Sequence, residues 1–186
     1  MKNIIKLTLT LLFLSSPAFA TTLSVGTTLS FLNINDPDFE YITNRDQLQL
    51  SSVSLGLNQR IGKTPFIATI STNRLINREV SREVRSKKNG AIFTNKTKTE
   101  ADSFTLGYKI GRYIPNIGIA NVGVDKSIYY AGKLAGEKQQ HAILGIFGLT
   151  YIASKDISIS STITLPNKEL NLESGVVLGI NYNFGL

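Results

Sequence analysis

The sequence predicts an all-β fold, an eight-stranded antiparallel up-and-down transmembrane β-barrel. Three observations predict it. Apolar residues alternate with small or polar ones in repeated short runs, and a period of two places successive side chains on opposite faces of a strand. No stretch after residue 20 follows the helical period. The connections between the runs alternate between long and short along the chain.

The first twenty residues are predicted to be a cleaved signal peptide rather than an uncleaved membrane anchor. Lys2 and Lys6 form a basic start, residues 7–14 are mostly apolar, and Ala18-Phe19-Ala20 matches a cleavage site. The apolar stretch is shorter than the ~20 residues that a transmembrane helix needs. We therefore expect export, with residues 21–186 forming one barrel domain. The absence of cysteine excludes a disulfide framework.

Eight alternating runs are predicted to be the strands. The alternation slips in phase at Ser51-Ser52 and near Ala120-Asn121, which predicts a β-bulge in each of these runs. The sixth run is apolar on both faces, so its orientation stays open. The eighth run alternates without a break, and Val176, Tyr182 and Phe184 lie on its apolar face. In chain order the runs cover residues 23–31, 48–57, 66–72, 103–111, 117–124, 142–152, 157–165 and 175–184.

The lengths of the connections predict how the barrel is oriented. Residues 33–47, 73–102, 125–141 and 166–174 form longer gaps, and residues 58–65, 112–116 and 153–156 form shorter ones. Bacterial outer-membrane barrels have an even number of strands, short periplasmic turns and longer external loops. The pattern therefore predicts a periplasmic position for both chain ends and an external position for every long gap.

A soluble eight-stranded barrel is the alternative, and two features disfavour it. The polar face consists of Gly, Ser, Thr and Asn rather than Lys and Glu, which suits a narrow barrel interior better than a surface in water. Aromatic residues also gather at the ends of the runs, as in the interfacial girdles of membrane barrels. They are Phe31, Phe66, Tyr108, Tyr113, Tyr151, Tyr182 and Phe184.

The end of the chain resembles the C-terminal β-signal of outer-membrane proteins. Residues 179–184, Gly-Ile-Asn-Tyr-Asn-Phe, match its pattern of glycine, two residues, an aromatic, one residue and an aromatic. The resemblance implies that the barrel-assembly machinery reads Gly179, Tyr182 and Phe184. Two departures are Leu178, where a polar residue is common, and the extra Gly185-Leu186. With the signal peptide and the eight runs, residues 21–186 resemble the small OmpA/OmpX-like and opacity-type surface barrels. Fold likeness alone assigns no function.

The gap at residues 73–102 is the candidate working surface. The whole chain has a formal net charge of +7, and loss of Lys2 and Lys6 leaves 18 of its 20 basic side chains against 13 acidic ones. Asn89-Gly90 favours a type I′ turn, so the strands on either side are expected to project as a ribbon. The candidate polyanion-binding residues are Arg74, Arg78, Arg82, Arg85, Lys87, Lys88, Lys96 and Lys98.

Lipopolysaccharide phosphates or host glycans would suit this basic loop, and an ordinary solvated loop is the alternative. The first gap is acidic, with Asp36, Asp38 and Glu40, so it can pair electrostatically with the basic loop. It lacks the spacing of an EF-hand calcium site. Lys109 is predicted to lie on the lumen face of its strand, where a buried charge needs a partner such as Asp125 or Glu173.

The residues offer little for catalysis. His141 is the only histidine, and a hydrolytic site needs a base beside a nucleophile, whereas Ile143 stands two residues on, where a deacylase pattern would place serine. One histidine and no cysteine give no metal site. No cofactor or nucleic-acid partner is expected.

The leading hypothesis is a non-enzymatic outer-membrane surface protein with a role in adhesion or envelope integrity. Its expected partners are membrane lipid, lipopolysaccharide, the assembly machinery and host glycans or surface proteins. A narrow porin-like channel for small solutes and a lipid A-modifying enzyme using His141 are the alternatives.

Overall fold

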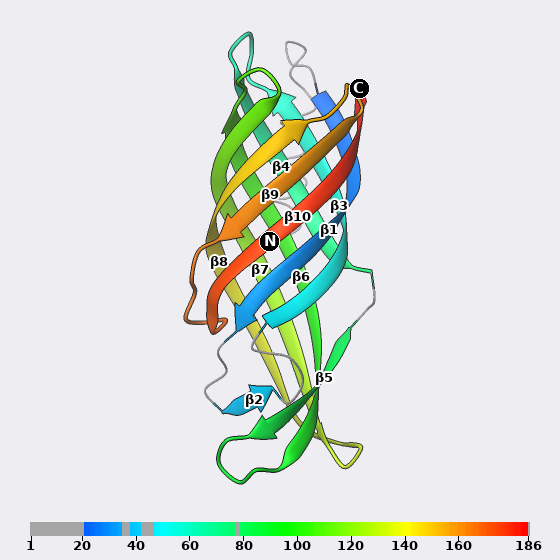
Figure 1. Ribbon diagram of the computed structural model, residues 1–186, viewed down its shortest axis with the longest axis vertical. Helices are drawn as coiled ribbons and strands as arrows, with labels where there is room; N and C mark the ends of the chain where they lie inside the picture. Colours follow the sequence, from blue (N-terminus) through cyan, green and yellow to red (C-terminus); the bar gives the residue numbers. More distant parts are fainter. Residues whose placement is uncertain (1–20, 35–37, 42–46, 77–78, 186) are drawn as a thin grey trace, which may run out of the picture.

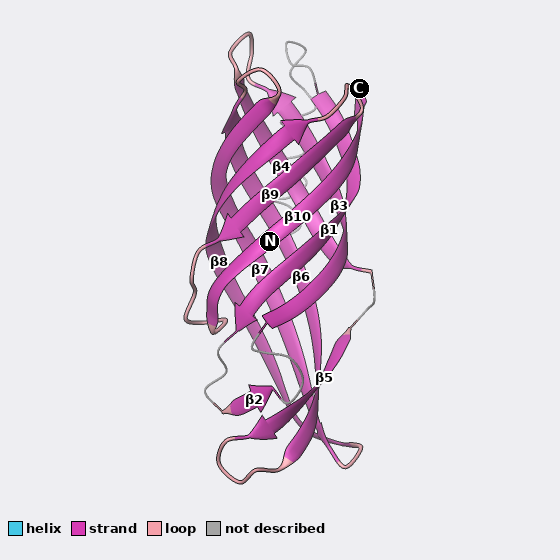
Figure 2. Cartoon of the chain, in the orientation of Figure 1, coloured by secondary structure: helices cyan, strands magenta, loops and turns pink. Residues whose placement is uncertain are grey.

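The computed structural model describes residues 21–34, 38–41, 47–76 and 79–185, so the predicted signal peptide lies outside the described residues. Among these residues ten strands form one sheet. Eight of them close into a barrel (Figures 1 and 2): β1 (Thr21–Ile34), β3 (Gln47–Arg60), β4 (Phe66–Leu75), β6 (Ile92–Tyr108), β7 (Tyr113–Tyr130), β8 (Lys133–Ile152), β9 (Ile157–Thr164) and β10 (Leu172–Gly185). In the part of the chain that is described, no helix is long and apolar enough to cross a membrane.

The barrel has up-and-down topology. Each barrel strand pairs antiparallel with the strands before and after it in the chain, and β1 pairs with β10 to close the ring. In this pairing Leu23 lies opposite Phe184, and Phe31 lies opposite Val176. The predicted eight-stranded barrel and the sealing role of the last run are confirmed. A closed ladder satisfies the backbone hydrogen bonds of every strand, as a membrane requires.

The two ends of the barrel differ. At one end, which we call the turn end, residues 61–65, 109–112 and 153–156 form short turns beside Thr21 and Gly185 (Figure 1, top). At the other, the loop end, β5 (Val80–Ser86) pairs with the outer part of β6, and β2 (Phe39–Tyr41) pairs with β5. Together with the extended β7 and β8 they form a five-stranded sheet beyond the barrel, the loop-end sheet (Figure 1, bottom).

The predicted long loop at residues 125–141 is wrong. β7 and β8 stay paired beyond the barrel, and Ala131-Gly132 joins them with φ values of 48° and 77°. Two positive φ values allow a two-residue hairpin turn that follows the twist of the strands. The tip at Asn89-Gly90 is confirmed in position, but only Gly90 has a positive φ there, 71°, so it is no type I′ turn.

The predicted bulges are also wrong. The register of β3 runs unbroken through Ser51-Ser52, and that of β7 through Ala120-Asn121. Register shifts occur instead at Asn33/Ile34 and Ile128/Tyr129. What changes along β3 is the chemistry of each face, because Leu50 is buried inside the barrel whereas Leu55 is 48% exposed on the outside.

Inside the loop-end half lies an apolar core that accounts for both phase slips. β3 contributes Leu48 and Leu50, β7 contributes Val124, and β8 contributes Leu144, all buried. These residues continue the inward-facing positions that carry serine and threonine nearer the turn end. The open orientation of the sixth run is thereby settled, because Leu144 faces inward while Ile143 is 66% exposed.

Candidate functional site

The outside of the barrel is an apolar belt with an aromatic girdle at the turn end. Large apolar side chains such as Ile119, Ile163 and Ile180 are more than half exposed there. Three ring pairs line the turn end: Phe66 with Tyr108, Tyr113 with Tyr151, and Tyr182 with Phe184, with centroids 5.2, 5.3 and 4.7 Å apart. Only lipid makes such a surface favourable, since in water a patch of this extent would drive association. Of the seven predicted girdle residues, Phe31 alone lies toward the loop end.

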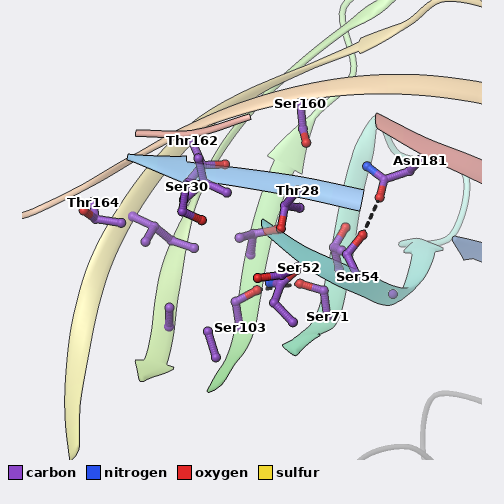
Figure 3. Close-up of a pocket in the computed structure, with 18 of the residues that line it drawn as sticks. Thr28, Ser30, Ser52, Ser54, Ser71, Ser103, Ser160, Thr162, Thr164 and Asn181 are labelled. Carbon is purple, nitrogen blue, oxygen red and sulfur yellow. Dashed lines mark hydrogen bonds between the residues drawn. The ribbon is translucent and has the colours of Figure 1, made fainter. Parts of the chain in front are cut away.

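The barrel encloses a cavity of about 540 Å³, which hydroxyl and amide groups line in the turn-end half and residues of the apolar core line in the loop-end half (Figure 3). Some of these groups bond to each other. Ser71 Oγ lies 2.7 Å from Ser103 Oγ, and Thr69 Oγ1 donates to Asn58 Oδ1 at 2.8 Å. The labelled lining residues in Figure 3 are Thr28, Ser30, Ser52, Ser54, Ser71, Ser103, Ser160, Thr162, Thr164 and Asn181.

Toward the loop end the cavity meets the apolar core. Leu170, in the connection between β9 and β10, is buried in this core, and Leu172 at the start of β10 joins it. The predicted lumen of small polar residues is thus correct for the turn-end half and wrong for the loop-end half. Apolar side chains therefore replace the polar lining of the cavity in the loop-end half.

The structure places the predicted lumen charge at the mouth of the cavity. Lys109 lines the cavity but is exposed in the turn after β6, where its N–H donates to Pro65 O at 2.8 Å. Asp125 and Glu173 lie toward the other end, so neither is its partner. The buried charge is Lys126, 6% exposed, which sequence reasoning missed. The sequence pattern could have identified it, because Lys126 falls on the same face of the strand as Val122 and Val124.

Three of the eight predicted polyanion-binding residues, Arg74, Lys96 and Lys98, lie beside carboxylates on the outward-facing side of β4 and β6. Arg74 Nε lies 3.5 Å from Glu100 Oε2, and Arg74 Nη2 lies 3.2 Å from Asp102 Oδ1. Lys98 lies opposite Asp125 in the β6–β7 pairing. These cations therefore have acidic neighbours within the protein.

Lys96 and Glu79 form the shortest of these contacts, with Nζ 2.7 Å from Oε1. The hydrogen bond from Lys96 lowers the pKa of Glu79 below its ordinary value, and the same bond raises the pKa of Lys96. Lys96 Nζ also lies 5.4 Å from the centre of the Tyr129 ring. These contacts connect Glu79, just before β5, to Lys96 in β6, and Lys96 to Tyr129 in β7.

The acidic first connection lies against the basic one, and the electrostatic pairing expected of Asp38 and Glu40 stays a prediction. Glu40 in β2 is opposite Arg85 in β5, and Asp38 O accepts the N–H of Lys87 at 3.1 Å. Arg82 points to the inner side of the sheet, where its neighbour Val84 is fully buried. Asp36 and Arg78 lie outside the described residues.

The tip of the β5–β6 hairpin carries a cluster of exposed basic residues. Arg85, Lys87 and Lys88 are exposed there within four residues. Beneath them, Phe93 packs edge-on against Phe39 at 5.7 Å and lies 5.2 Å from the Tyr130 ring. Aromatic packing of this kind gives the hairpin a firm base.

His141 lies outside the barrel, not in the lumen. It occupies a groove of about 430 Å³ with Arg74, Lys98, Glu100, Asp125 and Gln139, and the residues that line the groove include no serine. A Cβ on Gly123 would lie 3.1 Å from the His141 ring and 3.2 Å from Glu100 Cγ, so this glycine lets both side chains approach. The described residues contain no group of three or more possible ligands that could hold a metal ion.

The residues of the predicted assembly signal lie on β10. Tyr182 and Phe184 face outward in the girdle, whereas Gly179 faces inward, where a Cβ would come within 2.6 Å of Ser160 Oγ. Packing against Ser160 is therefore enough to account for a glycine at position 179. Recognition of Gly179 by the assembly machinery stays a prediction.

No protein-family model matches the sequence, and no curated protein is similar to it in sequence. The fold, however, is similar to solved structures. One is Ail, the attachment invasion locus protein of Yersinia pestis, in complex with the heparin analogue sucrose octasulfate: TM-score 0.59, 10% identity, covering 89% of this chain and 99% of that one. A second structure of Ail gives a TM-score of 0.54 at 10% identity, over 89% and 98% of the two chains. The outer membrane protein OprG from Pseudomonas aeruginosa gives 0.51 at 9% identity, over 91% and 97%.

At these identities the likeness concerns the fold. The chain has the fold of the small eight-stranded outer-membrane barrels, and its apolar belt fits a bilayer. The predicted outer-membrane architecture is confirmed on both grounds. In this class the turn end faces the periplasm and the loop end faces outward.

Proposed function

We propose that the protein is a bacterial outer-membrane surface protein that makes adhesive or structural contacts through its loop-end sheet. The observation that carries the proposal is the sheet itself. It continues β6, β7 and β8 beyond the apolar belt and adds β2 and β5, so it presents a fixed surface rather than flexible loops. Binding to a pre-ordered surface avoids the entropy cost of ordering it.

The tip of this sheet has the composition of a contact surface. Ile92, Tyr130 and Leu134 are each more than half exposed there, close to Arg85 and the two lysines. Interfaces are enriched in aromatic residues and arginine. Exposure of apolar side chains to water is unfavourable, and a bound partner that covered them would remove this unfavourable free energy.

Acidic glycans are the ligand class that this tip favours. Lys87 and Lys88 are both exposed at the end of a hairpin that is paired on both sides. The likeness to Ail supports the choice, because Ail is seen with a heparin analogue. Polyanion recognition is therefore assigned to the tip rather than to the whole predicted basic loop.

Heparin affinity of the refolded, purified protein tests this assignment. The variant Lys87→Gln/Lys88→Gln should elute from immobilised heparin at distinctly lower salt than the wild type, because two exposed positive charges are lost from the tip. Lys133→Gln/Lys138→Gln, which removes the same charge from the neighbouring hairpin, is the matched control and should elute nearer the wild type. Equal shifts for both variants would assign any binding to net charge, and no retention of the wild type would refute the glycan proposal.

The two alternatives gain less support. A narrow channel would have to pass the apolar core around Leu50 and Leu144. A lipid A-modifying enzyme would need a nucleophile beside His141. The groove is lined mainly by cations, carboxylates and an amide, and its hydroxyl residue, Thr99, also lines the barrel cavity. Neither function is proposed.

A further inference from the structure

The short turns of the turn end carry most of the net positive charge of the side chains after residue 20, although they hold only five of the 18 basic residues there. Arg60, Lys63, Lys109, Arg112 and Lys155 lie in or beside them, and Asp156 is the only acidic residue among them. We call these five cations the turn-end collar. At the loop end, by contrast, basic and acidic side chains are nearly equal in number in the part of the chain that is described.

The collar is one continuous arc. The N–H of Lys109 donates to Pro65 O at 2.8 Å, which joins the β3–β4 turn to the β6–β7 turn. The N–H of Ile152 donates to Arg112 O at 2.8 Å, which joins the β6–β7 turn to the β8–β9 turn. The rest of the rim, where β1 and β10 end, carries no charged side chain at Thr21, Thr22 and Gly185. The positive charge is therefore held on one side of the barrel mouth by ordered backbone.

The cations also lie at a defined depth. Tyr108 and Tyr113 of the girdle are the immediate neighbours of Lys109 and Arg112 in the chain. Aromatic girdles lie at the boundary between hydrocarbon and headgroups, so residues one step further out reach the level of the lipid phosphates. Lys155 has a side chain that is 90% exposed, and the Arg60 guanidinium donates to Thr64 O and Lys63 O.

We propose that the turn-end collar binds the phosphate groups of anionic phospholipids in the periplasmic leaflet. Five cations with one carboxylate repel each other, and phosphates at the same depth remove that repulsion. The inference rests on the barrel crossing the membrane and is independent of glycan binding at the opposite end.

The chain supplies its own probe for the experiment. It has no tryptophan, and Tyr108, Tyr113, Tyr151 and Tyr182 lie in the girdle beside the collar, whereas Tyr129 and Tyr130 lie in the loop-end sheet. Purified protein is refolded in phosphatidylcholine vesicles that contain brominated phosphatidylglycerol, and separately with brominated phosphatidylcholine. Quenching of tyrosine fluorescence then reports which lipid lies against the girdle.

The expected result is a several-fold preference of the wild type for phosphatidylglycerol that falls as salt is raised. Lys63→Gln/Lys109→Gln/Arg112→Gln/Lys155→Gln should abolish the preference. Lys87→Gln/Lys88→Gln/Lys133→Gln/Lys138→Gln removes the same charge at the loop end and should keep it. Heat-modifiable gel migration selects folded protein in each case, and if the full collar variant does not fold, Lys109→Gln/Lys155→Gln replaces it. No preference in the wild type, or equal preference in the collar variant, would overturn the proposal.

Discussion

Ser54 of β3 donates a hydrogen bond to Asn181 of β10 across the strand between them, with Oγ 2.9 Å from Oδ1 (Figure 3). That strand is β1, and its residue at this level is Gly26, opposite both partners. A Cβ on Gly26 would collide with Asn181 Oδ1 and with Ile180 O. The missing side chain therefore leaves room for a polar link across the seam that closes the barrel.

Replacement of Gly26 should weaken this seam. Gly26→Ala is expected to lower the free energy of unfolding by about 1–3 kcal/mol, because the new methyl group has to displace backbone and amide atoms. Gly136→Ala is the matched control, since nothing lies within 4 Å of a Cβ there. Urea unfolding of refolded protein, followed by circular dichroism, measures both. Equal effects of the two changes would show that Gly26 has no special packing role.

The apolar core should contribute more stability than the outer belt. Leu144→Ala is expected to cost about 2–5 kcal/mol, because it leaves a cavity among packed side chains. Ile143→Ala, one residue away on the lipid side, should cost much less, since lipid chains refill the space and are as apolar as the lost atoms. The same unfolding assay compares the two. A larger cost for Ile143→Ala would place the core on the wrong face.

The apolar core also shows which parts of the fold sequence reasoning could predict and which it could not. Period-two alternation identified all eight strands, their closure and the outward face of β10, because lipid outside and small residues inside make opposite demands on neighbouring positions. It misread Leu48-Gln49-Leu50 and Val122-Gly123-Val124, because a strand that turns from a polar to an apolar interior gives the same pattern as a bulge. Pairing register with both neighbours was needed to separate them.

The loop end was predicted least well for a related reason. Residues 125–141 are polar on both faces, which is typical of a loop, but hydrogen bonds to β6 and within the β7–β8 hairpin hold them as strands. The pairing of the predicted cations with Glu79, Glu100 and Asp102 depends on contacts between residues up to 28 positions apart. Local pattern carries no information on such contacts.

The Lys96–Glu79 pair predicts a definite pH dependence. The lowered pKa of Glu79 means that its contribution is complete above its ordinary value of 4.5 and is lost as pH falls through the lowered value. The raised pKa of Lys96 means that its contribution is complete below 10.5 and is lost as pH rises through the raised value. The pair should therefore stabilise the loop-end sheet evenly between these limits.

Carbon-13 NMR of the Glu79 carboxyl group measures the acid limit. Its titration midpoint should lie below 4.5 in the wild type and move upward in Lys96→Gln, because the donor is lost. Lys88→Gln, at the hairpin tip, should leave the midpoint unchanged. A midpoint indifferent to Lys96 would mean that the two side chains do not meet in solution.

Single-channel recording tests the closed interior. Refolded wild-type protein in planar bilayers should give no discrete conductance steps, because an ion would have to pass the apolar lining formed by Leu50, Leu144 and Leu170 in a narrow barrel. Heat-modifiable migration of the same sample confirms that the barrel is folded. Reproducible steps from folded protein would contradict the closed core and restore the channel hypothesis.

Cysteine labelling on intact cells tests the central claim most directly, because the chain has no cysteine of its own. Lys88→Cys at the hairpin tip and Lys155→Cys in the collar are exposed at opposite ends of the barrel. A membrane-impermeant maleimide should label Lys88→Cys on intact cells and should label Lys155→Cys only after the outer membrane is opened. Labelling of Lys155→Cys on intact cells, or protection of Lys88→Cys, would contradict a barrel that crosses the outer membrane with its loop-end sheet outside.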